Sequence, residues 1–116
     1  MSEVTIYHNP RCSKSRQTLT LLEELGIEPN IVNYLDTPPE AATLKALLSM
    51  LELDPRGLMR STEAPFSELG LDNPSLSDDE LIAAMIANPI LIERPIVVVG
   101  DRAAIGRPPE DVLNIL

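Results

Sequence analysis

Apolar and polar positions in the first 37 residues follow a strand, then a helix, then a second strand. VTIYH, residues 4–8, alternates apolar and polar positions and is rich in strand-forming residues. Residues 12–25 place leucines at helical spacing, and Gly26 follows as a common helix end. IVNYL, residues 31–35, predicts the second strand. A strand–helix–strand unit of this kind normally pairs its strands in parallel through a right-handed crossover.

The middle of the chain has a helical pattern. TPPE, residues 37–40, combines a threonine cap, proline in the first turn and glutamate three residues after the cap, which predicts a helix start. SDDE, residues 77–80, repeats the capping-box pattern and predicts a second helix. Residues 53–76 lie between them and predict loops, with short helices near 55–60 and 66–69.

The last part of the chain returns to strands. IVVV, residues 96–99, predicts a short, fully apolar strand, and Gly100 begins a tight turn. Residues 102–105 predict its partner, antiparallel because the connection is so short. Pro108 then opens a final helix.

This order of elements predicts an α/β chain with a thioredoxin-like fold. The sheet is expected to be mixed and four-stranded, built from a β-α-β half and a β-β-α half, with a helical insertion between them. A length of 116 residues suits one domain with a modest core. We therefore expect a single domain over residues 1–116, with the insertion at approximately 38–90.

Composition and charge narrow the function. The net charge of −9 argues against nucleic acid or an anionic membrane surface as a partner, because both require a basic face. No apolar run is long enough for a transmembrane helix, and the first residues show no secretory signal. A single cysteine cannot form an internal disulfide, so we expect a cytoplasmic protein.

Cys12 is the first candidate for chemistry. It lies in HNPRCSKSR, residues 8–16, at the start of the predicted helix. Unpaired N–H groups and the helix dipole lower a thiol pKa at such a position. Most lone cysteines are inert and buried, but the neighbours here are polar or basic, which favours a reactive thiolate. The hydroxyls of Ser13 and Ser15 could donate hydrogen bonds to its sulfur.

His8 is the second candidate, at the end of the predicted strand. A histidine there is usually structural, but as a cation or a hydrogen-bond donor it could favour the Cys12 thiolate. One cysteine and one histidine do not supply a zinc site, so we expect no metal. Without a second cysteine, any disulfide chemistry needs a thiol from another molecule.

Three arginines are the remaining candidates for a functional site. Taken singly, each is most simply interpreted as a solvated surface residue. Arg60 lies in a loop-like stretch, and Arg107 follows the predicted fourth strand. Arg94 precedes Pro95 and the strand at 96–99. In thioredoxin-like folds a cis-proline at this point faces the start of the active-site helix. If Pro95 is that proline, Arg94 is directed at Cys12.

Taken together, these segments resemble one family over essentially the whole chain. HNPRCSKSR, Arg60, NPILIERPIVV at 88–98 and GRPPE at 106–110 are similar to segments of the glutaredoxin-linked bacterial arsenate reductases. Lys14 and the short segment after the predicted final helix suggest a short, chromosomal-type member.

The resemblance implies a thioredoxin-like fold and a defined chemistry. It implies Cys12 as the nucleophile, His8 as a group that lowers the pKa of Cys12, and Ser15 as a hydrogen-bond partner of the thiolate. It also implies that three arginines bind the arsenate oxyanion: Arg60, Arg94 and Arg107. No bound cofactor is implied. Glutathione would be the co-substrate, and glutaredoxin would reduce the mixed disulfide between Cys12 and glutathione.

Two other interpretations fit the same residues. A monothiol glutaredoxin-like thiol transferase would use Cys12 and glutathione without arsenate. An Spx-type regulator would bind RNA polymerase and sense oxidants. Many such sensors carry a second cysteine three residues after the first, where this chain has Ser15.

Overall fold

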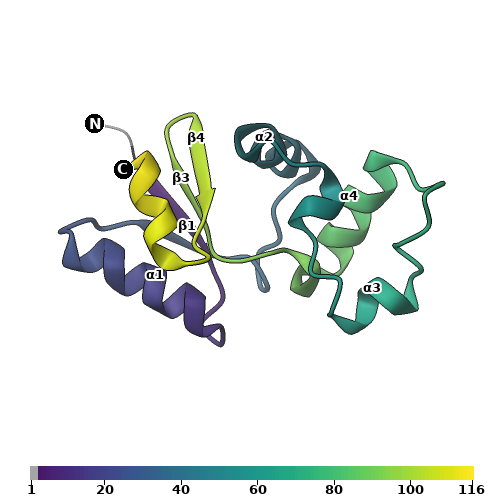
Figure 1. Cartoon of the computed structure of the whole chain (residues 1–116), viewed down its shortest axis with the longest axis horizontal. Coiled ribbons are helices and arrows are strands. Elements are labelled where there is room, and N and C mark those ends of the chain that lie inside the picture. Colours follow the sequence, from purple (N-terminus) through teal and green to yellow (C-terminus); the bar gives the residue numbers. More distant parts are fainter. Residues whose placement is uncertain (1–2) are drawn as a thin grey trace. The chain divides into compact units, whose positions relative to one another are not determined.

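A computed structural model describes residues 3–116 of the chain, which form two compact units (Figure 1). The sheet unit comprises residues 3–37 and 94–116. The helical unit runs from Pro38 to Glu93. The helical unit is therefore inserted between the two halves of the sheet unit.

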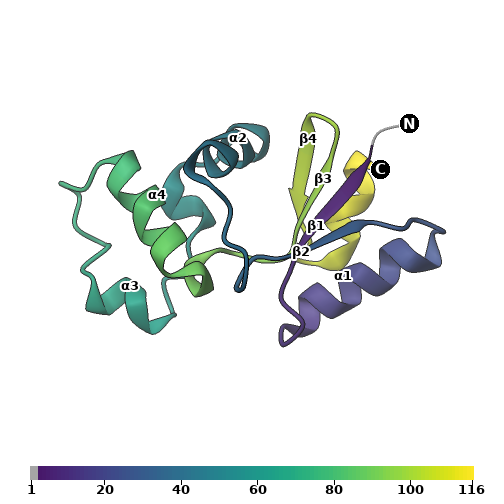
Figure 2. The ribbon, with the colours of Figure 1, turned by 180° about the vertical axis from the view of Figure 1, so that it is seen from behind.

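The sheet unit contains a mixed four-stranded sheet with the order β2-β1-β3-β4. Its strands are β1 (Val4–His8), β2 (Asn30–Asn33), β3 (Ile96–Val99) and β4 (Arg102–Ile105). β1 pairs in parallel with β2 and antiparallel with β3, which pairs antiparallel with β4. Figure 2 shows β2 beside β1, seen from behind. This topology confirms the predicted thioredoxin-like fold.

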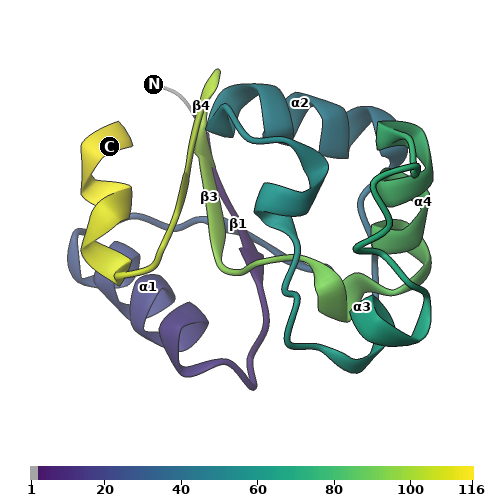
Figure 3. The same ribbon diagram turned by 45° about the vertical axis from the view of Figure 1, so that its right-hand side comes forward.

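Two helices cover one face of this sheet (Figure 3). They are α1 (Ser13–Glu24) and the 3₁₀ helix η3 (Pro109–Ile115), which contact each other. Apolar side chains from both helices and from the two central strands fill the space between: Ile6, Leu22, Val97, Val112 and Ile115. The core therefore fixes α1 and η3 side by side.

The helical unit has its own apolar interior. Its elements are α2 (Ala41–Leu51), η1 (Pro55–Leu58), α3 (Ala64–Glu68), α4 (Asp78–Ala87) and η2 (Pro89–Leu91). α4 packs against α2, η1 and η2, and Met85 of α4 is fully buried. Within the described residues, no helix combines the length and apolar composition needed to cross a membrane.

The capping box at the start of α4 is confirmed. Ser77 Oγ accepts a hydrogen bond from Glu80 N at 3.1 Å, and Glu80 Oε1 accepts one from Ser77 N at 3.2 Å. These two bonds satisfy N–H groups that the helix itself cannot pair.

The predicted helix start at 37–40 is wrong. α2 begins at Ala41 with Glu40 as its N-cap, so Thr37 does not cap it. The two consecutive prolines explain the shift, because a proline disfavours helical conformation in the residue before it. Pro39 therefore prevents Pro38 from serving as the first helical residue.

The second strand is also shorter than the predicted 31–35. It ends at Asn33, whose carbonyl oxygen accepts hydrogen bonds from Asp36 N at 3.1 Å and Thr37 N at 2.9 Å. A carbonyl used in this way forms a turn, and the chain leaves the sheet there.

Candidate active site

Cys12 is the N-cap residue of α1, immediately before the first helical turn. Its backbone N–H donates to Asn9 O at 3.0 Å, and its carbonyl accepts from Arg16 N at 3.0 Å. The backbone N–H groups of Lys14 and Ser15, in the first turn of α1, act to lower the pKa of the Cys12 thiol. The sulfur therefore occupies the position where a helix stabilises negative charge.

The balance of forces on this thiol favours its ionised form. Burial acts to raise the pKa of Cys12. The N–H groups of Ser15 and Lys14, followed by the positive charges on Arg107 and Arg94, act in the opposite direction and outweigh it. The pKa of Cys12 is consequently lower than that of an ordinary cysteine.

One of the predicted arginines contacts the sulfur, and the charge of a second acts on it. Arg107 Nη2 donates to Cys12 Sγ at 3.3 Å, and Arg107 Nε donates to Arg94 O at 2.8 Å. Arg94 is 6% exposed and is bonded to Pro95 through a cis peptide, which the sequence had left open. A second cis peptide, between Arg107 and Pro108, was not anticipated. Arg107 thus links the Cys12 sulfur to the backbone of Arg94.

Gly106 allows Arg107 to reach this position, and the sequence analysis missed it. Gly106 N donates to Pro95 O at 2.9 Å, at the end of β4. A Cβ atom at position 106 would lie 2.8 Å from Pro95 Cγ and would also overlap the side chain of Thr18 on α1. Glycine is therefore required for this close approach. Its presence in GRPPE, directly before Arg107, was the available signal.

The Ser15 hydroxyl does not occupy its predicted place. Ser15 Oγ pairs with His8 Nδ1 at 2.6 Å and accepts a hydrogen bond from Asn9 N at 3.0 Å. Ser15 is fully buried in this arrangement. The backbone N–H of Ser15, rather than its hydroxyl, acts to lower the pKa of the Cys12 thiol.

Of the two forms expected for His8, a cation or a neutral hydrogen-bond donor, the structure favours the neutral ring. Burial, followed by the positive charge of Arg16, lowers the pKa of His8, so the ring is neutral at neutral pH. Its hydrogen bond is to Ser15, and any influence on Cys12 passes through that residue. Among residues 3–116, no group of three or more His, Cys, Asp or Glu side chains could hold a metal ion.

Arg60 lies in the helical unit, in the segment between η1 and α3. Its backbone N–H donates to Leu91 O at 2.7 Å. Its guanidinium Nε lies 3.9 Å from carboxylate oxygens of both Glu63 and Glu93. These long ion pairs are partly exposed and hold the side chain weakly. The oxyanion-binding role of Arg60 stays a prediction.

Together, the fold and the site define a class: a thioredoxin-like protein with one activated thiolate at a helix N-terminus, under two arginines suited to an oxyanion. Comparison with known proteins then gives the family. Residues 7–115 match the ArsC family. The chain belongs to the ArsC family.

Several similar proteins cover nearly the whole chain. The Escherichia coli protein YfgD is 57% identical over 98% of this chain and 97% of its own length. An arsenate reductase of Neisseria meningitidis serogroup A is 50% identical over the full length of both chains. The solved structure of an arsenate reductase from Vibrio cholerae is 53% identical and has a TM-score of 0.96, covering 99% of this chain and 98% of that one. The family resemblance is confirmed.

Proposed function

We propose that this protein is an arsenate reductase that depends on glutathione and glutaredoxin. One observation carries the proposal: Cys12 is the N-cap residue of α1, and the Arg107 guanidinium donates to its sulfur at 3.3 Å. The chain is also 50% identical over its full length to the arsenate reductase of Neisseria meningitidis serogroup A, and this identity supports the same activity.

The charges at the site suit arsenate, which carries nearly two negative charges at neutral pH. Opposite unit charges about 4 Å apart attract by about 4 kcal/mol at an effective dielectric constant near 20. The planar guanidinium groups of Arg94 and Arg107 can each pair with two oxygens of the anion. We propose Arg60 as the third arginine.

The first chemical step is attack of the Cys12 thiolate on arsenic. A sulfur–arsenic bond forms, one arsenic–oxygen bond breaks, and the departing oxygen leaves as hydroxide, which takes up a proton as water. Arsenic remains pentavalent in this adduct. The arginines stabilise charge on the oxygens that stay bound to it.

The second step transfers two electrons. The thiolate of glutathione attacks the Cys12 sulfur, a disulfide bond forms, and the sulfur–arsenic bond breaks with its electron pair on arsenic. Each sulfur is oxidised by one electron, arsenic becomes trivalent, and arsenite leaves after protonation. Glutaredoxin then reduces the mixed disulfide by thiol–disulfide exchange. The chain needs these external thiols because Cys12 is its only cysteine. We therefore also propose that it works in the cytoplasm, where glutathione is maintained.

A coupled assay tests this function. Purified protein is mixed with arsenate, glutathione, glutaredoxin and glutathione reductase, and NADPH oxidation is followed for the wild type and Cys12→Ser. We expect arsenate-dependent oxidation that the variant lacks. If the wild type shows no arsenate dependence but reduces a glutathione mixed disulfide, the thiol transferase is correct instead. Capture of RNA polymerase by an arsenate-inactive protein would favour the regulator.

A further inference from the structure

The surroundings of the Cys12 sulfur suit more than one tetrahedral dianion. Arg107 Nη2 donates to this sulfur at 3.3 Å, and the charge of Arg94 also acts on it. The thiol and both arginines belong to the sheet unit. Guanidinium groups recognise an anion by its charge and by the arrangement of its oxygens, whatever its central atom. The atom that the thiolate can attack therefore decides which reaction follows.

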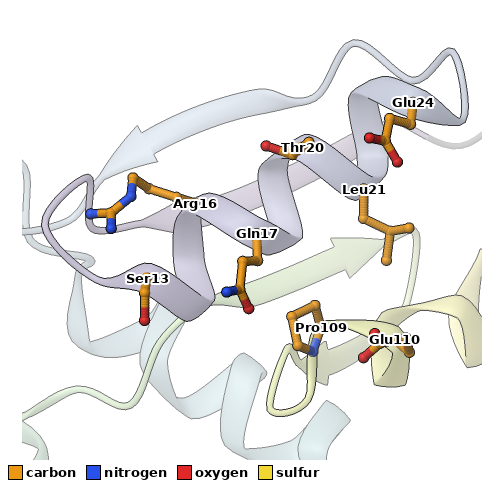
Figure 4. A pocket seen from close by; sticks show the side chains of 8 residues that line it. All are labelled: Ser13, Arg16, Gln17, Thr20, Leu21, Glu24, Pro109 and Glu110. Carbon is orange, nitrogen blue, oxygen red and sulfur yellow. The ribbon is translucent and has the colours of Figure 1, made fainter.

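A pocket of about 510 Å³ between α1 and the start of η3 is not an alternative site for such an anion (Figure 4). Neither Cys12 nor the two arginines line it. Its walls include Glu24 and Glu110, whose carboxylates repel a dianion. Arg16, its only basic residue, donates from Nη1 to Pro10 O at 2.9 Å. We therefore expect a dianion at the thiol and not in this pocket.

Thiosulfate is a dianion with the same tetrahedral outline as arsenate, but one of its corners is a sulfur atom. Its three oxygens can pair with guanidinium N–H groups as the oxygens of arsenate do. The outer sulfur is then left to face the thiolate. A thiolate attacks a sulfur–sulfur bond most readily when the departing group is weakly basic, and sulfite is such a group.

We propose that this site also transfers the outer sulfur of thiosulfate to a small thiol, through a persulfide of Cys12. The Cys12 thiolate attacks the outer sulfur, a new sulfur–sulfur bond forms, and the old one breaks with its electron pair on sulfite. The thiolate of the acceptor then attacks the outer sulfur of the persulfide. The acceptor leaves as its own persulfide, and the electron pair of the broken bond restores the Cys12 thiolate.

Two features of the chain favour this intermediate. The outer sulfur of the persulfide is negatively charged, and it forms beside the Arg107 guanidinium at the N-terminus of α1, where negative charge is stabilised. Cys12 is also the only cysteine of the chain, so no second thiol can displace the outer sulfur and form an internal disulfide. Persulfides of reactive cysteines are reversible. The sulfur is therefore held until an external acceptor arrives.

Mass spectrometry of the intact protein tests the first step. Reduced protein, freed of reductant, is mixed with thiosulfate or with sulfate, which has no outer sulfur to give. We expect the wild type to gain one sulfur atom from thiosulfate and none from sulfate, and cyanide to remove the added atom as thiocyanate. No gain in the wild type, or an equal gain in Cys12→Ser, would overturn the proposal.

Turnover with cyanide as the acceptor tests the arginine. Thiocyanate is measured while the thiosulfate concentration is varied, and Arg107→Gln should raise KM for thiosulfate about tenfold. Arg102→Gln is the matched control, because Arg102 is exposed on β4 and its Nη2 donates to Asn114 O at 3.0 Å. This control should keep the KM of the wild type. Equal values of KM in the two variants would contradict binding of thiosulfate at the thiol.

Arsenate links the two activities and also separates them. Because both dianions use the same arginines, arsenate should inhibit thiocyanate formation competitively with thiosulfate. Noncompetitive inhibition would place thiosulfate elsewhere and contradict the proposal. If the wild type forms thiocyanate but reduces no arsenate, the proposed function fails and sulfur transfer stands. If it reduces arsenate but forms neither the persulfide nor thiocyanate, sulfur transfer alone is refuted.

Discussion

The sheet unit and the helical unit bury different kinds of side chain. Every buried polar or charged residue among residues 3–116 belongs to the sheet unit: His8, Asn9, Ser15, Thr18 and Arg94. The buried side chains of the helical unit are apolar, as Leu44, Leu81 and Met85 illustrate. Burying polar groups costs free energy unless they are hydrogen-bonded. The comparison therefore places the chemistry in the sheet unit, which buries polar side chains despite this cost in free energy.

The largest effect should come from the thiol itself. Cys12→Ser should lower arsenate-dependent turnover at least about 1,000-fold, because a serine hydroxyl stays protonated where the thiol ionises. Circular dichroism should show an unchanged fold. Substantial turnover by this variant would mean that the sheet unit does not hold the nucleophile.

Removing a large side chain from the helical unit should affect stability rather than chemistry. Met85 is fully buried, so Met85→Ala should lower the free energy of unfolding by about 2–5 kcal/mol, as measured by urea denaturation. The pH midpoint of Cys12 alkylation in the folded variant should equal that of the wild type. A shifted midpoint would show that the helical core also controls the thiol.

Two arginine variants compare the units directly. Arg107→Gln should lower kcat/KM for arsenate about 10- to 100-fold and raise the pH midpoint of Cys12 alkylation, because Arg107 acts on both the anion and the thiolate. Arg60→Gln should raise KM for arsenate about tenfold and leave that midpoint unchanged. An unchanged KM for arsenate in Arg60→Gln would show that the helical unit contributes no arginine to the oxyanion site.

The smallest effect concerns His8 and pH. The pKa of His8 is lowered in the folded protein, so its contribution to stability is present above the unfolded value of about 6.5 and is lost as pH falls through the folded pKa. His8→Gln should therefore lose less stability than the wild type between about pH 7 and about pH 5. Urea denaturation at both pH values measures this difference, and equal losses would contradict a neutral, buried imidazole.

Local pattern predicted the parts of the molecule that depend on neighbouring residues. The capping box at Ser77 and the antiparallel pair 96–99 and 102–105 follow from short segments and were confirmed. The isomer of Pro95 was left open by the sequence, and the structure shows that it is cis. The predicted helix start at Thr37 was wrong because Pro39 disfavours the helical conformation in Pro38.

The details of the site depended on burial, which the sequence does not show. The charge of His8 and the partner of the Ser15 hydroxyl depend on the burial of these two side chains. Arg94 could be placed because the fold fixes the segment that enters β3. The role of Arg60 stays a prediction, since no local pattern fixes its loop.

Gly106 makes one position unusually intolerant of variation. It contributes no side chain and contacts no reactant, yet any Cβ there would meet Pro95 and Thr18. In a saturation library selected for arsenate resistance in cells, we expect glycine alone to survive at 106, whereas exposed positions such as Glu28 accept many residues. Position 106, which must carry no side chain, would then tolerate as few substitutions as position 12, which must carry the sulfur of Cys12.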